Sequence, residues 1–384
     1  MSADRTAIRR RLAVRRAAYR PPWSRRKAGH RPIVAPLTAT LAASVAVGVA
    51  VVLAKATRER RQAPLPRRDR KLGIRPGERP VDGLRRMALG QADLALELLE
   101  RGNATPSAKV VHDTRKALKR LRALLRLLEP ELGARTRARE DNTLRQIGRS
   151  LSGARDAEVL LHTLDALIER HPRKLARRKD LRKFRRLLLM ERQRMEQGTL
   201  SSSVARAHVL AELRAFRARL ASWSPPGAGA APIHPGLQKL YAQGRRRHRR
   251  AARSNSKDAH VMHRWRKRVK DLRYAAEMLQ QTQQPGPEGH GADAHLRRVA
   301  KRADDLGEML GEDHDLAVLA ERVRTATKRR GRGRSRKSRP LRRSTRNTLL
   351  KLIARRRRKL RKRALRDGER LYRRSAKLFV RRLS

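Results

Sequence analysis

The stretch VVHDTRKALKRLRALLRLL at Val110–Leu128 has a second copy, VMHRWRKRVKDLRYAAEML, at Val261–Leu279. Both copies read His-x-x-Arg-Lys-x-x-Lys-x-Leu-Arg. At about 100° per residue, the histidine and the basic residues at i+3, i+4, i+7 and i+10 share one face of a helix. We call this face the basic stripe. It consists of His112, Arg115, Lys116, Lys119 and Arg122 in the first copy and His263, Arg266, Lys267, Lys270 and Arg273 in the second.

The opposite face of each copy is apolar, so each predicted helix packs against a core and exposes its stripe. Thr105 and Ser256 are candidate N-cap residues in front of the two helices. The apolar positions are Val111, Leu118, Leu121, Leu125 and Leu128 in the first copy and Met262, Trp265, Val269, Leu272, Ala276 and Leu279 in the second.

The density of positive charge on the stripes is a functional signal. Like charges at i,i+3 and i,i+4 repel by about 0.2–0.5 kcal/mol per pair, so a solvated helix face usually mixes acids with bases. Asp113 lies off the first stripe, and Glu277 lies only at the far end of the second. Two copies of one pattern favour an anion-binding surface, and a solvated face is the alternative.

The composition of the whole chain indicates a polyanionic partner and an all-α fold. The 384 residues carry a net charge of +65, which favours binding to a polyanion. The absence of cysteine excludes disulfides and thiolate metal sites. Aromatic residues make up 3% of the chain, which is few for a protein that stacks unpaired bases. Strand-type alternation is almost absent.

The first 81 residues differ from the rest of the chain. We expect a basic N-terminal arm at 1–31, an uncharged segment at 32–54 and a basic linker at 55–81. The uncharged segment is long enough to span a membrane once. Positive charge on both sides leaves its orientation undetermined. The alternatives are a cleaved signal, because Ser24-Arg25-Arg26 resembles a twin-arginine start, and a buried core helix.

The order of motifs predicts an internal duplication. LSGARDAEVL at 151–160 returns as LGEDHDLAVL at 310–319, and the Pro- and Gly-rich stretch at 224–234 separates the two sets of motifs. The predicted halves are 82–223 and 235–384, each with four or more helices in a bundle.

At these motifs, residues 82–384 resemble the CHAD family, the conserved-histidine α-helical domain. The resemblance rests on HDTRKALKRLRALL, HRWRKRVKDLRYAAEML, the two repeated strings above and the ending ALRDGERLYRRSAKLFVRRL. It implies two tandem helical bundles related by a pseudo-twofold axis, with a basic central groove that binds inorganic polyphosphate. It also implies that the ten stripe residues are the polyphosphate ligands. The triphosphate-tunnel enzyme domain that often precedes this family has no counterpart here, so no hydrolase or cyclase activity is implied.

Neither metal binding nor catalysis has a clear pattern in the sequence. The positions that could supply a second ligand near each stripe histidine hold arginine and lysine, which repel a metal ion. The histidines are expected to donate to phosphate, and pairing with a local carboxylate is the alternative. Asp156 and Asp315 are interpreted as salt-bridged carboxylates rather than catalytic acids. We therefore expect no metal, no cofactor and no enzyme activity.

The leading hypothesis is a non-catalytic protein that binds inorganic polyphosphate or a similar linear polyanion. The alternatives are a nucleoid-associated or RNA-binding basic protein, which would bind nucleic acid without specificity, and a membrane-tethered scaffold. The expected location is a membrane, reached through residues 32–54, or the cytoplasm at polyphosphate granules. The sequence leaves the oligomeric state open.

Overall fold

The structure is a computed structural model, and all of the residues it describes belong to one compact unit, Leu65–Ser384. The predicted arm at 1–31 and the uncharged segment at 32–54 lie outside them. None of the helices within the described ranges has the length and apolar character needed to cross a membrane. The described ranges are 72–101, 106–151, 153–198, 203–223, 234–254, 258–280, 290–326 and 341–383.

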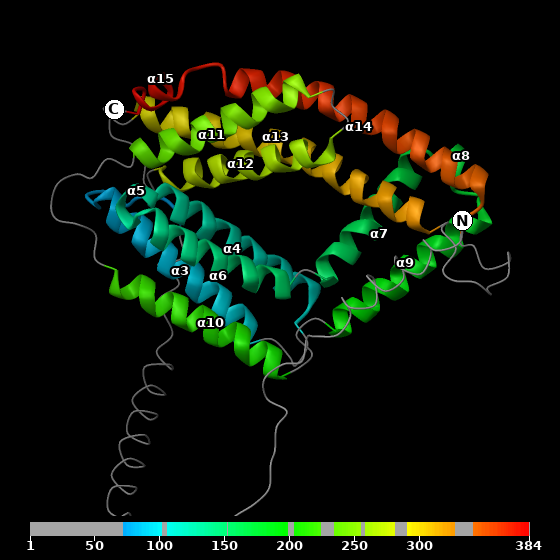
Figure 1. The fold of residues 1–384 in the computed structure, drawn as a ribbon, viewed down its shortest axis with the longest axis horizontal. Coiled ribbons are helices and arrows are strands. Elements are labelled where there is room, and N and C mark those ends of the chain that lie inside the picture. The colour runs from blue at the N-terminus through cyan, green and yellow to red at the C-terminus, as the bar shows by residue number, and fades with distance from the viewer. Residues whose placement is uncertain are drawn as a thin grey trace, which may run out of the picture. The chain divides into compact units, whose positions relative to one another are not determined.

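Every regular element longer than a single bridge residue in these ranges is a helix, which confirms the all-α prediction (Figure 1). The helices are α3 (Pro80–Glu100), α4 (Ala108–Leu127), α5 (Glu129–Leu132), α6 (Ala134–Ser150), α7 (Gly153–Arg170), α8 (Pro172–Leu175), α9 (Lys179–Gly198), α10 (Ser203–Ser222), α11 (His234–Arg253), α12 (Ala259–Met278), α13 (His290–Thr325), α14 (Arg343–Leu371) and α15 (Ala376–Val380).

The two copies of the repeat form α4 and α12. Both helices begin two residues later than the sequence indicated. Ser107 caps α4 by accepting a hydrogen bond from the Val110 amide at 3.3 Å, and Asp258 caps α12 by accepting one from the His260 amide at 2.8 Å. The predicted apolar faces are buried, with Leu279 alone partly exposed at the end of α12.

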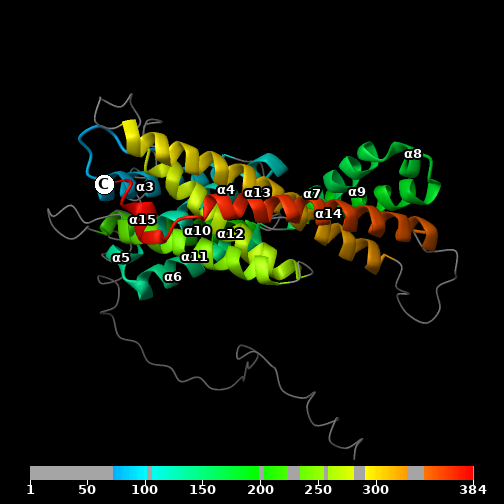
Figure 2. The same ribbon diagram turned by 90° about the horizontal axis from the view of Figure 1, so that it is seen from above.

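The described helices form two bundles, each around its own hydrophobic core. Core 1 unites α3, α4, α6 and α10 with α11, α12, α15, the first part of α13 and the end of α14. Core 2 unites α7, α8 and α9 with the end of α13 and most of α14. Figure 2 shows the helices of core 2 gathered around the start of α14. Each core therefore contains residues from both predicted halves of the sequence.

Helices that carry equivalent motifs pack against each other across the halves. α4 packs against α12, and α7 packs against α13. The string at 151–160 follows α6 and runs into α7, whereas its copy at 310–319 lies within α13. The pair α6 and α7 therefore corresponds to the single long helix α13. The start of α11 also meets the end of α4, since a Cβ atom on Gly236 would lie 1.9 Å from the backbone oxygen of Leu127. This contact is close enough to require glycine.

Candidate functional site

A cavity of about 1070 Å³ lies where the two bundles meet, with walls formed by α4, α7, α12, α13 and α14. Twelve lysine and arginine residues line it, against five carboxylates from the described residues. Four histidines, His112, His162, His263 and His314, also line it. The cavity therefore carries an excess of positive charge in a partly enclosed space.

Eight of the ten stripe residues line this one cavity. They are His112, Arg115, Lys119, Arg122, His263, Arg266, Lys267 and Lys270. Lys116 is exposed and lies outside the lining. Arg273 also lies outside it, because its guanidinium pairs with Glu277 at 2.6 Å and with Asp304. The structure thus brings both stripes to one place, and their role as anion ligands stays a prediction.

The helices α4 and α12 are rotated differently about their own axes, so their stripes face the cavity with different residues. Lys267 lines the cavity and its counterpart Lys116 does not, whereas Arg122 lines it and its counterpart Arg273 does not. Around a helix, Lys116 and Arg122 lie on opposite sides of the histidine direction. The repeated sequence is therefore equivalent in the two copies, but the wall that it forms is not symmetric.

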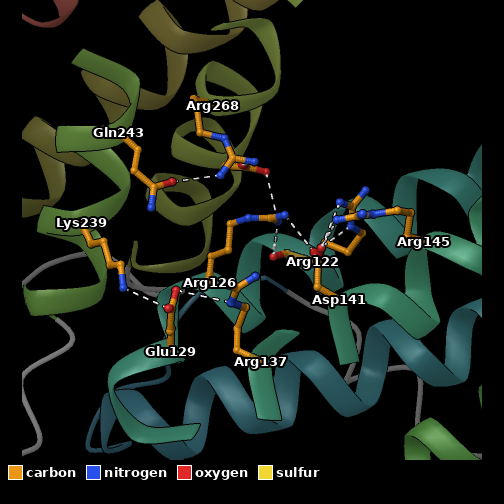
Figure 3. Close-up of polar contacts among 10 residues, drawn as sticks. Arg122, Arg126, Glu129, Arg137, Asp141, Arg145, Lys239, Gln243 and Arg268 are labelled. Carbon is orange, nitrogen blue, oxygen red and sulfur yellow. Dashed lines mark hydrogen bonds and ion pairs between the residues drawn. The ribbon is translucent and has the colours of Figure 1, made fainter. Parts of the chain in front are cut away.

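A buried carboxylate organises one end of the cavity (Figure 3). Asp141 on α6 is 2% exposed and accepts hydrogen bonds from Arg122 at 2.9 Å, Arg126 at 2.8 Å and Arg145 at 3.0 Å. Burial alone raises the pKa of Asp141, but the hydrogen bond from Arg122 and the charges of Arg126 and Arg122 outweigh it and lower the pKa to about 2. Asp141 is therefore ionised at neutral pH and fixes two cavity arginines.

The same network reaches α12 from α4. Arg126 lies 3.7 Å from Asp271, which pairs with Arg268 at 2.8 Å. Arg268 also donates to the amide oxygen of Gln243 on α11 at 3.0 Å. The sequence offered no signal for Asp141 or Asp271, because neither belongs to the repeated pattern.

Two histidines are in contact in the cavity wall. The ring centroids of His263 and His314 are 4.2 Å apart. Burial, then the neighbouring His314 and Lys267, lower the pKa of His263 to about 3. Burial and the charge of Arg266 also lower the pKa of His314. Both rings are therefore neutral at pH 7. The Nδ1 atom of His263 is buried and has no hydrogen-bond partner within the described ranges.

Two cavity lysines are surrounded by other cations. Burial and the charge of Arg122 lower the pKa of Lys267, and burial and the charge of Arg266 lower the pKa of Lys270. Arg122 belongs to the first stripe and Lys267 to the second, so the charges of the two stripes act on each other. Lys270 has a carboxylate neighbour, Glu308, at 3.9 Å. An anion in the cavity would favour the charged form of both lysines.

Sequence reasoning missed the basic residues that α7 and α14 contribute. Arg170, Arg356, Lys359 and Arg363 all line the cavity. Glu312 holds two of them, accepting from Arg356 at 2.6 Å and Arg170 at 3.3 Å. A signal existed in the run ARRRRKLRKR at 354–363, but only tertiary packing shows which of its side chains reach the cavity.

The carboxylates of the repeated strings also lie at this site. Asp156 and Asp315 both line the cavity, from α7 and α13. Within the described ranges, no group of three or more histidine, aspartate and glutamate side chains has an arrangement that could hold a metal ion.

Both the sequence and the fold are similar to those of known proteins. The family model for the CHAD domain matches residues 88–324. The crystal structure of the CHAD domain from the plant Ricinus communis is similar in fold, with a TM-score of 0.53 at 18% identity over 79% of this chain and 92% of that one. No curated protein sequence matches. The family match covers more than half of the sequence and includes both copies of the repeat, so the chain belongs to the CHAD domain family.

Proposed function

We propose that the protein binds inorganic polyphosphate, or a similar linear polyanion, in the cavity between the two bundles and performs no chemistry on it. The observation that supports this most strongly is the meeting of eight stripe residues from α4 and α12 in one cavity with a large excess of cations. A chain of phosphates presents one negative group after another, which suits cations repeated along two adjacent helices.

The side chains in the cavity suit phosphate in two ways. Arginine offers a planar fork of donors that pairs with two phosphate oxygens, and lysine acts as a compact point charge. Each phosphate contact releases condensed counterions, so binding should weaken steeply with salt. Only part of the positive charge is already matched, because twelve basic side chains face five carboxylates.

The cavity is less suited to nucleic acid than to a simple phosphate chain. Tyr274 is the one tyrosine, phenylalanine or tryptophan in the described lining, and it is 5% exposed. Proteins that hold single strands gain much of their affinity from bases stacked on exposed aromatic rings. The alternative is that nucleic acid binds without specificity to the basic exterior, and the experiment below distinguishes it from binding in the cavity.

The test is a titration of the full chain with polyphosphate and with duplex DNA at equal phosphate and salt concentrations. We expect tighter binding of polyphosphate, and replacement of Lys119 and Lys267 by glutamine should weaken polyphosphate binding much more than DNA binding. Equal losses for the two ligands would show that bulk charge, rather than the cavity, determines binding.

We also propose that residues 32–54 hold the protein at a membrane, with the cavity recruiting polyphosphate there. The support is the uncharged length of this segment and its arginine-rich flanks, which favour anionic headgroups. Fractionation of cells that express the full chain or a version without residues 1–56 tests this. Recovery of both versions in the soluble fraction would refute it.

A further inference from the structure

A second hollow, of about 360 Å³, lies beside α15, between α11, the first part of α13 and the end of α14. Six arginines line it, and none of the described carboxylates does. We call it the arginine pocket. The six are Arg298, Arg302, Arg370, Arg373, Arg374 and Arg382.

The arginine pocket is separate from the cavity between the bundles. Both use α13, but Arg302 lines the pocket and Gly311 lines the cavity. Nine residues at about 3.6 per turn make about two and a half turns, so these positions face opposite sides of the helix. A ligand in the pocket would therefore contact no residue of the cavity lining.

Ring stacking and hydrogen bonds hold the floor of the pocket together. The rings of Tyr241 and Phe379 stack with centroids 4.0 Å apart and planes 10° from parallel. The Tyr241 hydroxyl donates to the Leu371 carbonyl at 3.0 Å, and the Arg245 guanidinium donates to the Tyr372 carbonyl at 3.1 Å. These contacts fix the end of α14 and the turn that carries Arg373 and Arg374. A binding site whose backbone is already ordered loses less entropy when it takes a ligand.

His295 lines the pocket together with these arginines. Burial lowers the pKa of His295, and the charges of Arg298, Arg374 and Arg382 lower it further. The Nε2 atom of His295 is buried and has no hydrogen-bond partner in the described part of the chain. An unpaired buried polar atom is unfavourable.

Carboxylates neutralise little of this charge. Asp367 lies 3.7 Å from Arg370. For the side chains of the other five arginines, the structure shows no ion pair within the described ranges. Arg298, Arg302, Arg373 and Arg382 are exposed, so their charges are available to a ligand.

We propose that the arginine pocket is a second anion site, which binds a compact ligand carrying several phosphate groups. The chemistry fits either a short free phosphate chain or the phosphorylated headgroup of a lipid, because arginine forks pair with two oxygens of one phosphate. The volume is near the lower end of the roughly 300–1000 Å³ of small-ligand pockets. The site does not depend on what the larger cavity binds.

Calorimetric titration of the full chain with tripolyphosphate tests the proposal. The double variant R298Q/R302Q removes two exposed charges of the pocket. The matched control R186Q/R194Q removes two exposed arginines of α9 that line neither hollow. We expect two binding sites in the control. In R298Q/R302Q, one of these two sites should lose at least tenfold in affinity. Identical thermal melts would show that both variants are folded.

Two further arms separate the possible outcomes. The first arm uses vesicles containing phosphatidylinositol bisphosphate. The lipid headgroup is the ligand if R298Q/R302Q sediments with these vesicles less than R186Q/R194Q does and if tripolyphosphate binds the two variants equally. The variant K119Q/K267Q reports on the cavity alone. If it binds tripolyphosphate as tightly as the wild type does, that result counts against the proposed function and not against the pocket. Equal behaviour of R298Q/R302Q and R186Q/R194Q with both probes would overturn the proposal.

Discussion

Lys116 and Lys267 hold the same position in the two copies of the repeat, but only Lys267 lines the cavity. Lys267 also lies among cations, and burial and the charge of Arg122 lower its pKa. A side chain in this environment interacts strongly with an arriving anion. Lys116 lies outside the cavity lining, where water and salt screen its charge, so it interacts weakly with an anion in the cavity.

This difference leads to a prediction for two single substitutions. Lys267→Gln should reduce polyphosphate affinity and lower the slope of log K against log salt by roughly 0.7, the single-strand value for one contact. Lys116→Gln should change both much less, although it removes the same charge from the equivalent position. Salt-dependent titration of the two variants provides the measurement. Equal losses would mean that the whole stripe contacts the ligand.

At the scale of elements, Asp141 connects α6 to α4 and, through Arg126, to α12. Replacing it with asparagine would leave Arg126, which is 8% exposed, without the carboxylate that accepts its hydrogen bond. We expect Asp141→Asn to lower the free energy of unfolding by about 3–5 kcal/mol, the usual cost of breaking a buried pair. Urea unfolding at pH 7 would measure it, and a loss below about 1 kcal/mol would contradict this role.

The effect should also depend on pH. The pKa of Asp141 is about 2 in the folded protein and about 3.9 in an unfolded chain. A depressed pKa stabilises the fold above the unfolded value, and this stabilisation is lost as the pH falls through the folded value. The difference in stability between the wild type and Asp141→Asn should therefore be constant above about pH 5 and shrink between about pH 4 and 2. A difference unchanged at pH 3 would contradict it.

The contact between α11 and the end of α4 gives a second prediction for the elements. Gly236→Ala would place a methyl group against the Leu127 carbonyl, which is backbone and cannot move independently. We expect a loss of about 1–3 kcal/mol, as for other overpacked sites. Gly148→Ala in α6 is the control, since its nearest contact would be an ordinary 3.9 Å from Leu118. The control should be neutral or stabilising by up to about 1 kcal/mol.

For the whole molecule, the shared cores decide how the chain folds. Leu84 and Leu124 share core 1 with Tyr241 and Trp265, and Phe184 shares core 2 with Ile353. Separating the predicted halves would expose apolar surface on both sides of each core.

We therefore expect the fragments 82–223 and 235–384 to lack a cooperative thermal transition when each is expressed alone. Mixing them should restore helicity and polyphosphate binding, because the cavity needs walls from both. Circular dichroism melts of the separate and mixed fragments would show this. A sharp transition in either fragment alone would mean that the half folds by itself.

The sequence by itself determined the all-α class, the two helices that carry the stripes and the faces those helices bury. These properties follow from helical periodicity, which depends only on residues a few positions apart, as between Val111 and Leu118 or Trp265 and Val269. Family membership followed from the same local motifs in their order along the chain.

Only the tertiary structure decided the rest of the candidate site. The rotation of α12 that brings Lys267 into the cavity and turns Arg273 toward Asp304 depends on how α12 packs against α4 and α13. The contributions of Asp141, His314 and Arg356 and the existence of the arginine pocket depend on contacts between residues far apart in the chain. No local pattern encodes such contacts, because they arise only when two helices are packed side by side.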